Sequence, residues 1–451
     1  MKNTAIKKKS MPQINYFKIA CFTVLHLLFG GQLFAQEDMT LQELISRALD
    51  ENYQIQIYRN LADAASNSNT IGNAGILPII DLTGEARNEI NNSRQTFLSG
   101  ETQNANNAQN TSLAGGIGAR WIVFDGLAMF ARKNQLEELE LLSQADKRFY
   151  VEQTVSDISL LYYQLIQEDQ LLNAYRKSLE VSQTRVKFER RAVDVGSSDM
   201  LDLQLALVDR NTDSSMVLQQ EARIQELSIS LNRIINQELT IQIKPADSIQ
   251  LNSSFNLVQL LESARENNAQ LSQQQLNELI ALSEVKIRSG ELFPEIELFG
   301  NYAYNRQQNE VGFLSSRRSY GPDFGVRVRF NLFSGGQKQI ARRNANIALE
   351  NEELLYKDLD REIEASLRTA YLRWANSLKQ VSLEEESVNA AVHALEIASK
   401  QYEIGEITNI DFRLIQLNAI NARTRMLEAQ YLAKSREIEM LRMSGRLLQD
   451  L

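Results

Sequence analysis

The sequence predicts a mainly helical, elongated protein that carries a few membrane-type β-strands and is organised as two structural repeats. Three patterns support this fold class. One layout of residues occurs twice, two long segments repeat apolar residues every seven positions, and four short segments alternate between apolar and polar residues. Together they predict long coiled-coil helices with strands that contribute to a membrane β-barrel.

The duplication is visible residue by residue. Six positions of the first half return 216 residues later with the same or similar side chains: Leu41, Leu44, Ile45, Ala48, Asn52 and Ile55 become Leu257, Leu260, Leu261, Ala264, Asn268 and Leu271. Pro78 and Pro294 have the same offset, and each follows a helical pattern and opens a strand-like one. A repeat with both helical and strand parts indicates a pseudo-symmetric structural body, not an enzyme built around one pocket.

The repeat also divides the chain. Residues 1–35 have the basic start, apolar middle and small-residue exit of a secretory signal, and the apolar stretch is too short to span a bilayer. We expect a first repeat over 36–243, a polar linker over 244–256 that contains Pro245, and a second repeat over 257–451.

Composition excludes several functions. Removing the signal leaves 43 basic against 57 acidic residues, about −14 in all, whereas nucleic-acid binding needs a basic patch. The one cysteine, Cys21, lies in the signal, and His393 is then the sole histidine. We therefore expect no nucleic-acid partner, no catalytic residues, no cofactor and no metal site.

Two long segments, 127–194 and 338–403, read as uninterrupted helices. Apolar residues recur at intervals of seven from Val151 to Val193 in the first segment and from Leu367 to Tyr402 in the second. Each helix would be roughly 100 Å long at 1.5 Å per residue. Shorter helical patterns cover about 40–74, 198–236, 257–291 and 407–446. Two short helices placed end to end would match one long helix, which predicts a rod.

Four segments alternate with the period of a strand: 79–90, 112–124, 295–305 and 323–333. They form two hairpins, at about 78–124 and 294–333, with polar loops expected over 91–111 and 306–320. In the last segment Val326 and Val328 share one face, and Arg327 and Arg329 share the other. Each segment has about the length that a tilted strand needs to cross a bilayer.

Four membrane strands cannot form a closed wall in one chain. Backbone polar groups must be paired in hydrocarbon, so membrane strands close into barrels, of which the smallest have eight strands. Two copies would give an interior filled by side chains, whereas three copies would pool twelve strands around an opening. The strands therefore favour a homotrimer, with two small sheets in water as the alternative.

Several short motifs resemble the TolC-like outer membrane efflux proteins, the outer membrane factors. They are the double repeat, the strand entry Leu292–Pro294, the strand exits Phe124–Gly126 and Phe333–Gly336, and the turn Tyr402–Gly405. The resemblance implies a trimeric twelve-stranded barrel in outer-membrane lipid and a helical tunnel that extends into the periplasm. It also implies docking to a periplasmic adaptor and to an inner-membrane transporter of RND, ABC or MFS type. Such a protein is a passive exit duct for efflux or type I secretion. The sequence does not distinguish between drugs, metals and polypeptides as its cargo.

Two aspartates are candidates for a periplasmic constriction. Asp202 and Asp411 each lie six residues after a turn glycine, and the resemblance implies that Asp411 belongs to an acidic ring that closes the tunnel. Carboxylates repeated by threefold symmetry would repel anions and attract cations. Stabilisation of a helix N-terminus is the alternative, which we favour for Asp202. Leu414 occupies the position of the family's second acidic ring, which predicts a looser or differently sealed gate.

The two turns between long and short helices are the predicted docking tips for the adaptor. They comprise Val195, Gly196, Ser197, Ile404, Gly405 and Glu406. Ordinary helix-hairpin chemistry is the alternative, with glycine ending one helix and Ser198 or Thr408 starting the next.

Aromatic residues near the strand ends are predicted to mark the membrane interfaces. Trp121, Phe124, Phe330 and Phe333 would lie at the periplasmic ends, with Tyr302 and Tyr304 toward the other end. Core packing where the strands meet the helices is the alternative. For the whole chain, the rival is a soluble periplasmic coiled-coil adaptor or scaffold, which would share the heptads but would need only one helical hairpin.

Overall fold

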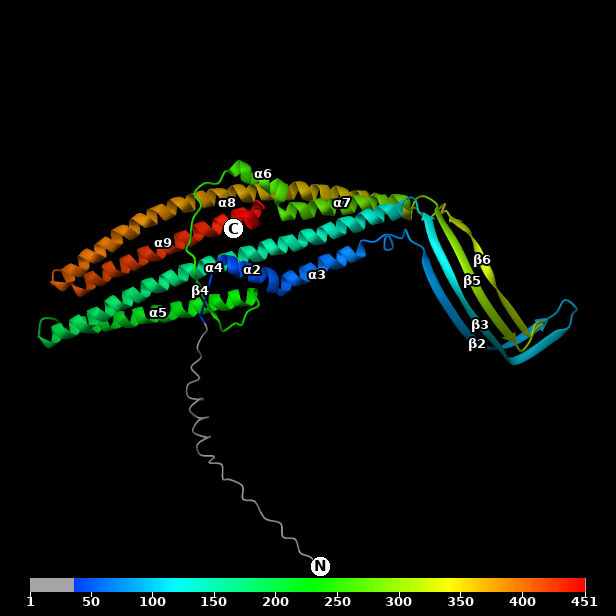
Figure 1. Ribbon diagram of the computed structural model, residues 1–451, viewed down its shortest axis with the longest axis horizontal. Helices are drawn as coiled ribbons and strands as arrows, with labels where there is room; N and C mark the ends of the chain where they lie inside the picture. The colour runs from blue at the N-terminus through cyan, green and yellow to red at the C-terminus, as the bar shows by residue number, and fades with distance from the viewer. Residues whose placement is uncertain (1–35, 451) are drawn as a thin grey trace, which may run out of the picture.

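The computed structural model describes residues 36–450, so the predicted signal segment lies outside the described residues. Figure 1 shows an elongated molecule in which a bundle of long helices continues at one end into a single curved sheet. The ends of two helical hairpins form the opposite end of the molecule. The rod predicted from the heptads is therefore present within one chain.

The same order of elements occurs twice. The first half contains α2 (Leu41–Glu51), α3 (Tyr53–Ser68), β2 (Ile79–Thr96), β3 (Thr102–Phe124), α4 (Ala128–Asp194) and α5 (Met200–Ile234). The second contains α6 (Leu257–Asn267), α7 (Ala269–Gly290), β5 (Glu295–Asn309), β6 (Ser316–Arg329), α8 (Gln337–Glu403) and α9 (Asn409–Met443). The long helices α4 and α8 both have 67 residues, and α5 and α9 both have 35. A short parallel pair, β1 (Gln36–Met39) and β4 (Gln242–Pro245), and the terminal helix α10 (Leu447–Asp450) complete the chain.

The heptad positions form the core of the helical body. The α4–α5 hairpin lies beside the α8–α9 hairpin, while α3 and α7 cover the ends of the long helices nearer the sheet (Figure 1). Ile158, Leu165 and Leu367 are completely buried, and Trp374 is 3% exposed. Within residues 36–450, no helix combines the length and the apolar composition needed to cross a membrane. The seven-residue stripe packs mainly within each hairpin, with Leu165 of α4 in a cluster with α5 and Val388 of α8 in a cluster with α9. A separate cluster that contains Val155 of α4 and Ile438 of α9 joins the two hairpins.

Two equivalent asparagines join the short helices of each repeat to the end of a neighbouring helix. Asn52 Oδ1 accepts hydrogen bonds from the first amides of α3, and its Nδ2 donates to Ile234 O at 2.8 Å. Asn268 does the same for α7 and donates to Met443 O at 2.8 Å. These residues divide the helices expected over 40–74 and 257–291, because an N-cap residue has an extended backbone that interrupts the helix.

The strands extend further into the expected loops than predicted, whereas β6 ends at Arg329 and not at 333 as expected. The polar loop expected over 91–111 is wrong for most of its length, because β2 continues to Thr96 and β3 begins at Thr102. The loop expected over 306–320 shrinks in the same way, to 310–315. Backbone pairing sustains these extensions, together with side-chain hydrogen bonds such as that between the hydroxyls of Thr96 and Thr102. Apolar and polar residues alternate along a strand only where one of its faces meets an apolar environment. In these extensions Asn, Gln and Thr occupy both faces, so the sequence shows no alternation.

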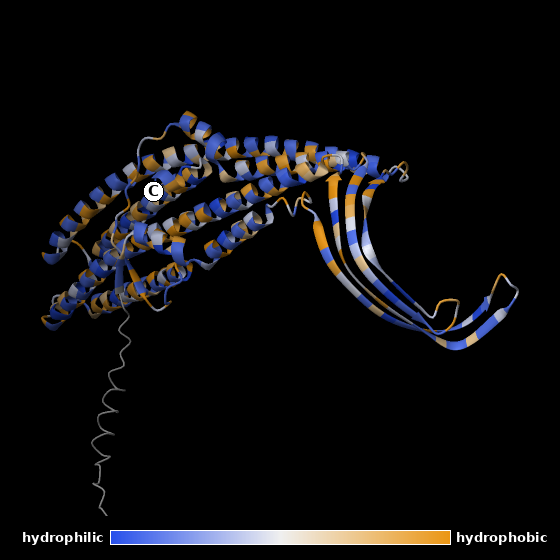
Figure 2. Ribbon diagram, turned by 45° about the vertical axis from the view of Figure 1, so that its right-hand side comes forward, coloured by the Kyte–Doolittle hydropathy of each residue, from blue (hydrophilic) through white to orange (hydrophobic). Residues whose placement is uncertain are grey.

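The four long strands form one antiparallel sheet in the order β2-β3-β5-β6, which leaves β2 and β6 as free edges. The two faces of the sheet differ in polarity, because residues paired across the strands share a face. Hydrophilic (blue) and hydrophobic (orange) residues alternate along the strands in Figure 2. One face, here called the apolar face, carries Ile80, Leu82, Ile117, Trp121, Leu298, Tyr302, Phe324, Val326 and Val328. The opposite charged face carries Asp81, Glu85, Arg120, Glu295, Glu297, Arg327 and Arg329. The sheet is therefore built to separate two different environments.

The asparagine caps yield a local stability prediction. Asn268→Ala removes the acceptor for the amides of Gln270 and Leu271 and the donor to Met443, which should cost about 2 kcal/mol. Hydrogen exchange should show faster exchange of those two amides in α7. Asn52→Ala is the matched control, since it should release the start of α3 and leave α7 protected. Unchanged exchange at α7 in the first variant would contradict the assigned role.

Candidate functional site

The tips of the two helical hairpins have the same backbone construction. Gly196 (φ +79°) and Gly405 (φ +78°) adopt the left-handed conformation that ends a helix without strain only at glycine. In each tip the amide after the glycine bonds to a carbonyl five residues earlier, Ser197 to Ala192 and Glu406 to Gln401, both at 2.8 Å. Helix-hairpin chemistry is therefore present at both predicted docking tips.

The tips expose apolar side chains at the end of the molecule. Val195 is 77% exposed and Ile404 is 70% exposed, and the first turns of α5 and α9 add Leu201 and Ile410, both also exposed. Ser197 and Glu406 are exposed beside them. An exposed turn with large aliphatic side chains is suited to bind another protein, as well as to end a helix.

The two predicted constriction residues lie in the first turns of the returning helices. Asp411 is exposed, its amide donates to Thr408 Oγ1 at 3.1 Å, and the Thr408 hydroxyl donates back to the carboxylate at 2.6 Å. Asp202 is half-buried, and its carbonyl accepts a hydrogen bond from Asn409 Nδ2 at 3.2 Å. Both acids favour a helix N-terminus, and only Asp411 presents its side chain to the surroundings.

One expected cap is wrong. Asp199, and not Ser198, is the N-cap of α5, since its side chain accepts from the amide of Leu201. The Ser198 hydroxyl instead donates to Glu189 of α4 at 2.7 Å. Thr408 does cap α9, as predicted. Adjacent Ser and Asp are both good caps, so their sequence could not distinguish them.

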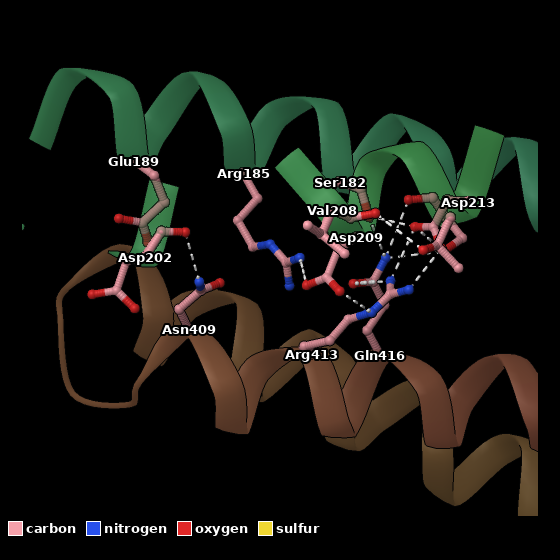
Figure 3. A network of polar contacts seen from close by, with 12 residues as sticks. Ser182, Arg185, Glu189, Asp202, Val208, Asp209, Asp213, Asn409, Arg413 and Gln416 are labelled. Carbon is pink, nitrogen blue, oxygen red and sulfur yellow. Dashed lines mark hydrogen bonds and ion pairs between the residues drawn. The ribbon is translucent and has the colours of Figure 1, made fainter. Parts of the chain in front are cut away.

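A buried polar cluster joins the two hairpins just inside the tips (Figure 3). We call it the tip cluster; it comprises Ser178, Ser182, Arg185, Glu189, Asp209, Asp213, Tyr402, Arg413 and Gln416. Its centre is a two-pronged ion pair, with Arg413 Nη2 at 2.8 Å and Nη1 at 3.0 Å from the carboxylate of Asp213. Asp213 is 1% exposed and also accepts bonds from the hydroxyls of Ser178 and Ser182. Such a paired and saturated carboxylate is stable in an interior.

Further links run toward the tip. Asp209 lies between two guanidinium groups, because it pairs with Arg185 of α4 and lies 3.5 Å from Arg413 Nε of α9. The Tyr402 hydroxyl of α8 donates to Glu189 of α4. Burial first, and then this carboxylate, hold the pKa of Tyr402 well above its usual range. Tyr402 is therefore a neutral donor at all physiological pH values, and the link does not titrate through the tyrosine.

This cluster was not among the residues predicted from the sequence, although the sequence contains a signal for it. In α5, residues spaced by seven run Ala206, Asp213, Gln220 and Leu227, and all four are buried. A charged residue in a buried heptad line indicates a buried polar partner on a neighbouring helix. Only the tertiary structure identifies Arg413, 200 residues away, as that partner.

The predicted strand entries and four of the six predicted interface aromatics lie where the sheet meets the helices, whereas Tyr302 and Tyr304 lie near the middle of β5. Pro78 and Pro294 immediately precede β2 and β5. Near the helices, Trp121 Nε1 donates to Ile76 O at 2.8 Å, and Phe124 is half-buried.

The other predicted aromatics are mostly open to the surroundings. Phe330 and Phe333 are 51% and 86% exposed, so the core-packing alternative does not describe them within one chain. Tyr302, which is 53% exposed, and the half-buried Tyr304 lie farther along the apolar face.

Comparisons with known proteins agree with this architecture. Residues 260–446 match the model of the family described as outer membrane efflux protein. The chain is 24% identical over 426 residues to the proteases secretion protein PrtF of Dickeya chrysanthemi, covering 92% of this chain and 89% of that protein. It is 22% identical over 405 residues to the outer membrane protein TolC of Vibrio cholerae, covering 87% of each. The predicted resemblance to the TolC-like outer membrane efflux proteins is confirmed.

Solved structures show the same TolC-like fold. The CmeC outer membrane channel of Campylobacter jejuni has a TM-score of 0.77 at 13% identity, covering 99% of this chain and 94% of that chain. The outer membrane protein VceC of Vibrio cholerae has a TM-score of 0.73 at 16% identity, covering 90% and 96%. The predicted placement in the outer membrane with a periplasmic extension, and the exit-duct function, fit these relatives. The soluble adaptor alternative does not.

The tip cluster yields a prediction about the hairpin contact. Arg413→Gln leaves the buried Asp213 carboxylate without its cation, which should cost about 3–5 kcal/mol and speed hydrogen exchange at the tip-side halves of α5 and α9. Arg425→Gln on the same helix is the control. It breaks a partly exposed pair with Glu384, which should cost about 0–1 kcal/mol. Equal effects of the two variants would show that the cluster does not join the hairpins.

Proposed function

We propose that three copies of this chain form one channel through the outer membrane and the periplasm. The channel passively conducts substrate that an inner-membrane transporter of RND, ABC or MFS type delivers through a periplasmic adaptor. The observation that carries this proposal is the sheet, which has one apolar face, one charged face and two free edges. Lipid suits the first face, water suits the second, and further strands suit the edges.

The free edges support closure by neighbouring copies. Consecutive strands of the sheet are antiparallel, so β2 and β6 run in opposite directions. The β6 edge of one copy can therefore pair with the β2 edge of the next and continue the same antiparallel pattern. Three copies close a twelve-stranded ring without any unpaired edge, and a ring of that size leaves a lumen. The two repeats, 36–243 and 257–451, would alternate around the helical wall.

The charged face supports a water-filled lumen. Arg329 lies 3.5 Å from Glu295, and Arg120 lies 3.7 Å from Asp81. Arg327 pairs with Glu297 and also stacks on the Phe299 ring, with its Cζ 4.8 Å from the ring centroid. Charged pairs that are half exposed, as these guanidinium groups are, need water on their open side.

The tips supply the proposed gate and docking site. In the trimer Asp411 would contribute an acidic ring, and exposed Leu414 would replace a second ring with an aliphatic one. Binding of an adaptor to Val195, Ile404 and their neighbours would rotate one hairpin against the other around Gly196 and Gly405. The tip cluster would resist that rotation, because its ion pairs cross from α5 to α9 and the hydrogen bonds of Gln416 cross from α9 to α4. The transporter selects the cargo, whether drug, metal or polypeptide.

Conductance tests the constriction. Asp411→Ala should raise single-channel conductance in planar bilayers or reduce block by multivalent cations, because it removes three carboxylates from the narrowest part. Glu406→Ala removes an exposed acid from the adjacent turn and serves as the control, with conductance expected to stay near wild type. Unchanged conductance and cation block in the Asp411 variant would remove this residue from the gate.

Mass measurement tests the assembly. The protein extracted from membranes in mild detergent should have about three times the protomer mass after correction for bound detergent, since the sheet edges need neighbours. Osmotic shock without detergent should not release it. A clean monomer, or release by osmotic shock, would contradict the shared barrel.

A further inference from the structure

Charged side chains are distributed unevenly between the two faces of the sheet. From its helical end to the bulge at Asn91, all the acidic residues of the four strands lie on the charged face. Only two charged residues of this region lie on the apolar face, and both are arginines: Arg306 on β5 and Arg318 on β6. Because every other charged residue of this region lies on the opposite face, the presence of these two arginines on the apolar face calls for a physical explanation.

The two arginines occupy directly opposite positions. Arg306 pairs with Arg318 in the β5–β6 register, and Leu113 of β3 continues the same row. Opposed side chains on one face have Cβ atoms about 5 Å apart, and like charges at that spacing repel each other. Both side chains are exposed, and neither guanidinium forms an ion pair or a hydrogen bond within residues 36–450. The pair therefore lacks an anion that would neutralise it.

The position of the two arginines along the strands indicates which anion would neutralise them. The next row toward the helices is the tyrosine pair Tyr304 and Tyr320, and the apolar rows then continue to Ile296 and Val328. Ten residues separate Arg318 from Val328, a rise of roughly 25 Å for a tilted strand, which matches the apolar band of an outer-membrane barrel. With the helices in the periplasm, the arginines lie at the headgroups of the outer leaflet, just beyond a tyrosine row typical of a membrane interface.

We infer that Arg306 and Arg318 bind a phosphate group of an outer-leaflet lipid. Two guanidinium groups side by side present parallel donors that fit phosphate oxygens in a bidentate manner, and the bound charge removes their mutual repulsion. The acyl chains of the same lipid would lie along Tyr304, Tyr320 and the apolar rows below. This inference rests on the proposed function, because it requires the apolar face to lie in lipid.

Binding of defined lipids to the detergent-solubilised, full-length mature protein tests this site. The probes are lipid A with both phosphates, dephosphorylated lipid A and inorganic phosphate, and the readouts are bound lipid by native mass spectrometry and the shift in Tm. Wild type should bind phosphorylated lipid A in preference to the dephosphorylated form. The double variant R306Q/R318Q should weaken that binding roughly tenfold or more. R317Q, which removes a charge from the same strand on the opposite face, should bind like wild type.

Each other result overturns the inference. Undiminished binding by R306Q/R318Q, or an equal loss in R317Q, would show that the pair is not the site. Equal binding of dephosphorylated lipid A would remove the phosphate from recognition, and an equal Tm shift with inorganic phosphate would indicate a general anion site. The mass of the same sample distinguishes failure of the lipid site from failure of the channel proposal. A trimer without lipid selectivity rejects only the lipid site, whereas a monomer rejects the channel as well.

Discussion

Backbone pairing in a medium without water is the constraint on which the rest of this molecule depends. The long strands β2 and β6 leave rows of amides and carbonyls unpaired in a single chain, beside a face that is apolar over several rows. The unpaired edges are not stable in lipid, because an unpaired backbone group there costs several kcal/mol, and the apolar face is unfavourable in water. In the proposed trimer, pairing between copies would satisfy the edges, place the apolar face in lipid and place the charged face and its arginine–carboxylate pairs around water.

A different constraint acts at the helical end of the molecule, on the contact between the two hairpins. In the proposed channel the two hairpins would have to stay together at rest and still be able to move, and an apolar contact alone would favour only the first. The structure interrupts this contact near the tips with Arg413, Asp213 and Asp209. Buried ion pairs add little net stability but demand one geometry, since removing or displacing one partner leaves a charge uncompensated. The tip cluster therefore fixes a defined arrangement where a partner protein would act.

Local patterns predicted most elements because their causes are local. The long helix expected over 127–194 runs from Ala128 to Asp194, since its heptads contain no proline and its end has Gly196. Strand extent was underestimated where Asn and Gln occupy both faces, because pairing there depends on the partner strand and not on alternation. Ser198 was wrongly expected as a cap for a similar reason: its hydroxyl is taken by Glu189, a residue of another helix.

The sequence by itself determined the duplication, the lengths of the long helices, the turn glycines and the alternation of the strands near the helices. All of these follow from periodicity and from the conformational preferences of glycine and proline. Only the tertiary structure decided that Arg413 meets Asp213, that Asn52 and Asn268 each tie a short helix to a distant carbonyl, and that Arg306 lies opposite Arg318. Such contacts join residues from different elements, and register and packing, which no single segment encodes, bring them together.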